Sequence, residues 1–151
     1  MAGLVVAFTV ALAGCTGAPQ PEAEKPAEQV TADASSDAPE ECADAFPHAI
    51  GTPSLAEVEA LPADWPEPPA GSTLCLTASA LGDGGSESIS YATPATADAV
   101  LAYYEDALGG YSVARETSPT GGEMLVGDGG AVSFQIRPGE GSIVIALVST
   151  G

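Results

Sequence analysis

The sequence of 151 residues is poor in basic residues and has a single histidine. Three basic residues, Lys25, Arg115 and Arg137, stand against 21 acidic ones, so the formal charge is −18. This charge repels polyanions, and no basic stripe is present to neutralise phosphates, so we expect no nucleic acid partner. Because His48 is the only histidine, a serine or cysteine nucleophile would lack its usual base. The length allows one modest domain.

Motifs that hold cofactors or metals are also missing. The sequence contains no CxxC pair, phosphate-binding loop or dinucleotide fingerprint. Gly-Asp-Gly-Gly occurs twice, at 82–85 and 127–130, but each copy has one carboxylate where calcium needs several oxygens. Asp-Gly suits type I′ turns, so we interpret both copies as hairpin turns. We therefore expect no catalytic residue, metal ligand or cofactor, and we interpret the protein as a non-enzyme.

No apolar run is long enough to span a membrane, but one lies near the start. Residues 4–13 form ten residues with a single hydroxyl, whereas a transmembrane helix needs about 20 apolar residues. A short apolar run of this kind is typical of an export signal. Small residues and a cysteine follow it directly, as Leu12-Ala13-Gly14-Cys15.

This tetrapeptide resembles the lipobox of bacterial lipoproteins. The resemblance implies cleavage of a signal peptide, residues 1–14, and lipid attachment to the sulfur of Cys15. Two or more acyl chains would then hold the protein on the extracytoplasmic side of the cell membrane. The alternatives are a secretory peptide that is cleaved elsewhere, or an uncleaved amphipathic start.

The next segment predicts a disordered tether that covers 15–41 together with the lipidated cysteine. From Thr16 to Glu41 it holds seven acids, four prolines and one large aliphatic residue, Val30. Such a segment cannot bury enough apolar surface to offset the entropy of ordering. Twenty-six disordered residues span on the order of 30 Å, which would hold a domain at 42–151 clear of the membrane.

Two cysteines remain when Cys15 is assigned to lipid. Outside the cytosol, disulfides form and persist, so Cys42 and Cys75 are predicted to be bonded. The closed loop of some 34 residues should stabilise the domain by roughly 3–4 kcal/mol.

From residue 73 onward the pattern alternates strands with Gly-rich turns. Leu74, Leu76 and Ala78 alternate with polar residues, which predicts one apolar strand face. Further strands are expected at 86–91, 111–113, 124–126 and 132–137. Residues 143–148 are apolar on both faces, which is typical of a central strand that is covered on each side.

One substantial helix is predicted between the second and third strands. Thr93 could cap it, Pro94 would take its first position, and Gly109-Gly110 would end it. Val100, Tyr104 and Leu108 share one face. The expected fold is therefore α+β: an antiparallel sheet of about five to six strands with one main helix packed on one face.

The order of these parts resembles that of small actinobacterial lipoproteins. The resemblance covers about residues 62–149 and includes a Trp/Pro-rich entry at 65–69, the helical segment 99–104 and Leu108-Gly109-Gly110-Tyr111. Proteins of that type are mostly of unknown function, so the resemblance implies no site residue.

Three functions remain open from the sequence. The leading interpretation is a lipid-anchored module that binds or supports an envelope protein or small ligand. The first alternative is a secreted or membrane-anchored hydrolase that uses a carboxylate pair. The second is a scavenger of cations or cationic peptides, which the charge of −18 suggests.

Overall fold

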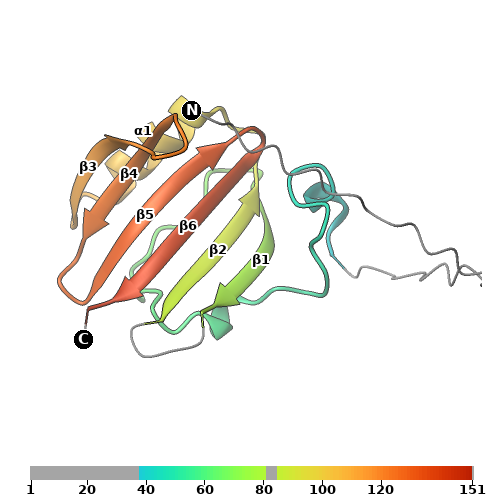
Figure 1. The fold of residues 1–151 in the computed structure, drawn as a ribbon, viewed down its shortest axis with the longest axis horizontal. Helices are drawn as coiled ribbons and strands as arrows, with labels where there is room; N and C mark the ends of the chain where they lie inside the picture. The colour runs from blue at the N-terminus through green and yellow to red at the C-terminus, as the bar shows by residue number, and fades with distance from the viewer. Residues whose placement is uncertain (1–37, 81–84, 151) are drawn as a thin grey trace, which may run out of the picture. The chain divides into compact units, whose positions relative to one another are not determined.

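The computed structural model describes residues 38–80 and 85–150, and these form a six-stranded antiparallel sheet with one α-helix (Figure 1). The predicted α+β fold is confirmed. The elements are two single-turn 3-10 helices, six strands and the α-helix, in the order η1 (Glu40–Cys42), η2 (Leu55–Glu57), β1 (Thr73–Ser79), β2 (Ser86–Ala92), α1 (Ala97–Ala107), β3 (Ser112–Thr117), β4 (Glu123–Asp128), β5 (Val132–Gly139) and β6 (Ser142–Ser149). The predicted signal peptide, Cys15 and nearly all of the predicted tether lie outside the described residues. Residues 38–41 of that tether are described, and η1 includes its last two residues.

The strands follow the spatial order β1-β2-β6-β5-β4-β3. β1 and β2 form one edge of the sheet, and the connection through α1 takes the chain to the opposite edge at β3. β3 to β6 then return as a meander until β6 pairs with β2. The C-terminal strand therefore closes the sheet between two segments that are far apart in sequence.

One face of the sheet, here called the covered face, packs against α1. Cross-strand partners place Ile89, Ile145, Ile136 and Leu125 in one row across the sheet, and all four are fully buried. The buried side of α1 consists of Val100, Leu101 and Tyr104, with Leu108 at its end. α1 contacts β4 and β5 and lies behind the sheet at that end (Figure 1). Non-helical residues cover the rest, because Val58, Leu61 and Trp65 join the same core.

Strand β1 breaks the predicted alternation. Leu74 pairs with Tyr91 on the covered face, whereas Leu76 pairs with Ser90, whose side chain points to the opposite face. A bulge between Leu74 and Leu76 causes the switch, because one extra residue reverses the side-chain direction. The expectation of a single apolar face along Leu74, Leu76 and Ala78 is therefore wrong.

Strand β6 is central, as predicted, but only one of its faces is fully covered. Ile143, Ile145 and Leu147 are fully buried beneath the covered-face core. Within the described residues, Val144 and Ala146 on the opposite face are half-buried, and Val148 is exposed. An apolar run thus reflects a central position here without complete burial of both faces.

Helix α1 begins later than predicted. Its N-cap is Thr96, whose hydroxyl accepts a hydrogen bond from the Ala99 amide at 3.4 Å. Thr93 belongs to the preceding turn, because its hydroxyl accepts from the Ala95 amide and from the Ser72 hydroxyl. Capping strength is similar for both threonines, so the tertiary contact to Ser72 decides between them.

The second Gly-Asp-Gly-Gly segment is a hairpin turn between β4 and β5, as expected, but not of type I′. Asp128 keeps a negative φ, and the left-handed residue is Gly130 at φ +82°. The other glycines are required by packing: a Cβ on Gly127 would lie 2.1 Å from the Phe134 ring. The first copy falls largely outside the described residues.

Candidate functional site

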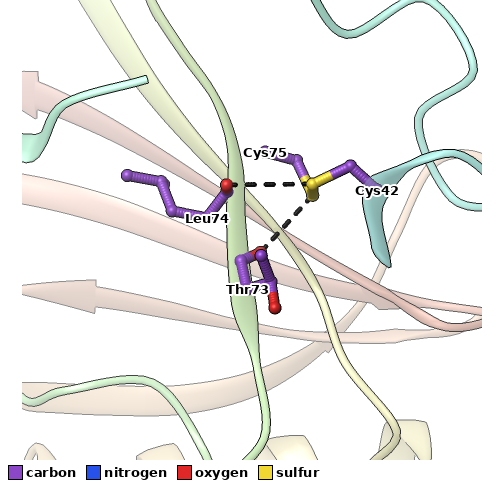
Figure 2. Close-up of a disulfide and its surroundings, with 4 residues drawn as sticks. All are labelled: Cys42, Thr73, Leu74 and Cys75. Atoms are coloured by element: carbon purple, nitrogen blue, oxygen red, sulfur yellow. Dashed lines mark hydrogen bonds between the residues drawn. A yellow bond between two sulfur atoms is a disulfide. The ribbon is translucent and has the colours of Figure 1, made fainter. Parts of the chain in front are cut away.

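The predicted disulfide partners meet at the edge of the sheet. The sulfurs of Cys42 and Cys75 are at bonding distance, with Cα atoms 5.5 Å apart (Figure 2). They lie near the carbonyl oxygens of Leu74 and Thr73. The bridge therefore fastens the segment around η1 to strand β1 at its bulge.

A small core surrounds this bridge, separate from the helix-covered one. Cys42, Ala49, Cys75 and Ala92 are all buried, and Phe46 packs against them. Ala92 pairs with Thr73 and points to the opposite face of the sheet. The η1 segment therefore covers part of that face, and its position depends on small side chains and one covalent bond.

Beside η1 lies a concavity that we call the acidic hollow. It has a volume of about 610 Å³ and is bounded by the η1 segment, the start of β1, the end of β2 and the β5–β6 turn. Three carboxylates line it, from Glu41, Asp44 and Glu140, and none of its lining residues is basic. The disulfide positions two of these acids, because Glu41 and Asp44 flank Cys42.

Hydroxyl groups and a backbone bond organise one wall of the acidic hollow. Thr93 is buried and accepts a hydrogen bond from the Ser72 hydroxyl at 2.9 Å. Its amide donates to the Gly141 carbonyl at 2.9 Å, which joins the end of β2 to the β5–β6 turn. The turn that carries Glu140 is therefore held against the segment before α1.

The chemistry of the acidic hollow suits an organic cation. All three carboxylates are exposed, and in the described part of the chain no three Asp, Glu, His or Cys side chains converge closely enough to hold a metal ion. Separate carboxylates around a space of this size favour ammonium or guanidinium groups, which charge and hydrogen bonds recognise together.

One acid with a structural role, Glu87, was missed at the sequence level, where the acids were interpreted as solvated surface. Glu87 lies on β2 and is buried at 9% exposure. It accepts hydrogen bonds from the amides of Glu59 and Ala60 and from the Ser79 hydroxyl. Burial raises the pKa of Glu87, but these three donors outweigh it and hold the pKa below its ordinary value. Serines alternate with Glu87 and Ile89 along the strand, so the sequence pattern did not distinguish Glu87 from the polar positions.

The carboxylates of Glu105 and Asp128 also have pKa values below their ordinary ones. The Arg115 guanidinium donates to both oxygens of Glu105 at 2.6 and 2.8 Å, and this bonding lowers the pKa of Glu105. Hydrogen bonds from the Gly130 amide and the Ser133 hydroxyl lower the pKa of Asp128. A general acid needs a raised pKa, so none of these groups supports the carboxylate-pair alternative.

The remaining sequence-level candidates are placed as follows. His48 is exposed in the loop after η1, and Arg137 is exposed on the opposite face with a hydrogen bond to Gln135. Cys15 lies outside the described residues. Within residues 38–80 and 85–150, no helix has the length and apolar character needed to cross a membrane.

Comparison of the chain with protein-family models, with curated proteins and with solved structures finds no match.

Proposed function

We propose that the protein is a lipoprotein, anchored through Cys15 on the extracytoplasmic side of the cell membrane, whose folded domain is a binding module. The lipobox-like residues 12–15 support the anchor. The Cys42–Cys75 bridge supports the compartment, because disulfides persist outside the reducing cytosol. An acidic segment before residue 38 would hold the domain away from the membrane surface.

The acidic hollow carries the binding part of the proposal. It combines about 610 Å³ of space with three carboxylates and no basic lining residue. The ligand class that fits is a molecule or peptide with two or more cationic groups. The overall charge of −18 would raise the rate at which such a ligand arrives.

The anchor is tested with the full chain carrying Cys15→Ser in a bacterial host. Metabolic labelling with a clickable fatty acid should mark the wild type and leave the variant unmarked. In detergent phase partitioning, the labelled wild type should enter the detergent phase and the unlabelled variant should stay in the aqueous phase. Equal labelling of both chains would overturn lipid attachment at this sulfur.

The binding role is tested by calorimetric titration of the full chain with an acetylated, amidated tetralysine peptide. The variant Glu41→Gln/Asp44→Asn/Glu140→Gln removes the three carboxylates of the hollow. The matched variant Asp106→Asn/Glu116→Gln/Glu123→Gln removes the same charge from the region of α1, β3 and β4. We expect the first variant to lose at least about ten-fold in affinity and the second about two-fold. Equal losses would show that diffuse charge, and not the hollow, attracts the peptide.

A further inference from the structure

A second concavity, here called the proline groove, lies beneath the segment that enters β1. Its volume is about 460 Å³, and it shares only Gly71 with the acidic hollow. Apolar side chains line it, from Leu55, Leu61, Trp65, Leu74 and Tyr91, together with the prolines of 66–69. The size falls within the usual range for small-molecule sites.

The lining of the proline groove is close to neutral. Its one charged residue, Glu67, is exposed, and the Glu67 carbonyl accepts a hydrogen bond from the Tyr103 hydroxyl at 2.7 Å. At 37% exposure each, Leu55 and Tyr103 are among the few exposed large apolar residues of the described chain. An ionic ligand would find no counter-charge inside the groove, whereas an apolar one would bury surface on both sides.

Two largely buried tyrosines lie here, Tyr91 in the groove lining and Tyr104 near Tyr91, and of the two only the Tyr104 hydroxyl is buried without a hydrogen-bond partner among the described residues. Tyr91 lines the groove at 5% exposure, and burial alone raises its pKa. Tyr104 is fully buried, and its hydroxyl has no partner. Burial raises the pKa of Tyr104, and the neighbouring phenols of Tyr91 and Tyr103 raise it further. Both hydroxyls therefore stay protonated, and that of Tyr91 is available as a donor in the groove.

The groove wall is held in place before any ligand arrives. The Trp65 ring packs edge-on against the rings of Phe134 and Tyr111, with ring centroids 5.0 and 6.0 Å apart, respectively. The Tyr111 hydroxyl in turn donates to Asp64 at 3.0 Å. The prolines that follow Trp65 restrict the backbone further, so little ordering would accompany binding.

We propose that the proline groove binds a neutral, largely apolar molecule with a carbonyl oxygen, which accepts a hydrogen bond from the Tyr91 hydroxyl. The Tyr91 hydroxyl lies in the groove lining and makes no hydrogen bond to the described residues, so a ligand oxygen can accept a hydrogen bond from it. This site is independent of the proposed function, because its lining and its ligand chemistry differ from those of the acidic hollow.

The test is photolabelling of the full chain with benzophenone, a neutral aromatic ketone that attaches to nearby C–H groups under ultraviolet light. Mass spectrometry of the digested protein should locate the label on residues 55–74 or 91. Tyr91→Phe should raise the concentration for half-maximal labelling about five-fold, as expected for one hydrogen bond. Ser133→Ala is the control, because it removes a hydroxyl that is bonded to Asp128 and lies outside the groove lining.

A second pair of variants tests the groove without touching the phenols. Ala70 is exposed and lines the groove, so Ala70→Trp should fill it and abolish saturable labelling. Ala63→Trp adds the same side chain at an exposed position outside the lining and should leave labelling unchanged. Label scattered over the surface, or unaffected by Ala70→Trp, would overturn the site. Unchanged half-maximal labelling in Tyr91→Phe would overturn the role of the hydroxyl.

Discussion

The two faces of the sheet are stabilised in different ways. The covered face carries a continuous row of fully buried aliphatic residues against α1 and the segment around Trp65. The opposite face has half-buried Val144 and Ala146, and its η1 segment is held by a disulfide over a small core. The comparison teaches that apolar packing by one helix and a non-helical segment stabilises one face, whereas on the other face a covalent bond supplements a small core.

The sharpest test of this comparison uses neighbouring residues of β6. Ile145→Ala should lower the free energy of unfolding by about 3–4 kcal/mol, because it leaves a cavity in the covered-face core. Val144→Ala, one residue away on the half-buried opposite face, should cost about 1 kcal/mol or less. Urea unfolding followed by circular dichroism measures both. Equal losses would contradict the difference between the faces.

Removal of the bridge tests the opposite face. Cys42→Ala/Cys75→Ala should cost about 3 kcal/mol, mainly because the unfolded chain gains conformational freedom. A phosphine reductant should lower the free energy of unfolding of the wild type by a similar amount and leave that of the double variant unchanged. Two alkylatable thiols at positions 42 and 75 of the unreduced, denatured protein would refute the bridge itself.

Glu87 tests how a non-helical segment is held on the covered face. Glu87→Gln should cost about 1–3 kcal/mol, because the amide cannot replace a carboxylate that accepts three hydrogen bonds. Glu116→Gln on exposed β3 is the control and should change stability by less than about 0.5 kcal/mol.

The same residue predicts a pH dependence. Since folding lowers the pKa of Glu87, its stabilising contribution is present above its ordinary pKa of 4.5 and lost as pH falls through the lower value. The difference in stability between wild type and Glu87→Gln should therefore shrink as pH falls below 4.5. A gap that stays constant from pH 7 to pH 3 would contradict the assignment.

The smallest effect is expected where the covered face reaches its edge. Arg115 pairs with Leu125 in the register, and an exposed ion pair with Glu105 replaces apolar packing there. Exposed ion pairs contribute little to stability, so Arg115→Gln should leave the thermal midpoint within experimental error. A loss of stability as large as that of Ile145→Ala would show that Arg115 packs as part of the covered-face core.

Local patterns predicted the strands, the helix and the cysteine pairing, because each depends on short-range periodicity or on a residue count. The side-chain direction along β1 was not predictable, since a single bulge at the disulfide reverses it. The start of α1 also escaped prediction, because the Ser72 contact of Thr93 joins residues 21 positions apart.

The candidate sites show the same division. The acids of the hollow and the apolar residues of the proline groove are scattered through the sequence, and no spacing rule connects Glu41 with Glu140 or Leu55 with Tyr91. Glu87 looked like a solvated acid, because two of its three donors, the amides of Glu59 and Ala60, come from a distant segment.

The sequence by itself determined the acidic charge, the lipobox-like start, the cysteine count and the α+β order of elements, because composition and periodicity act within a few residues. Only the tertiary structure decided which acids line a common hollow, which phenol is buried without a partner and which face of the sheet is covered. Those properties depend on contacts between distant segments, and these contacts exist only after the chain has folded.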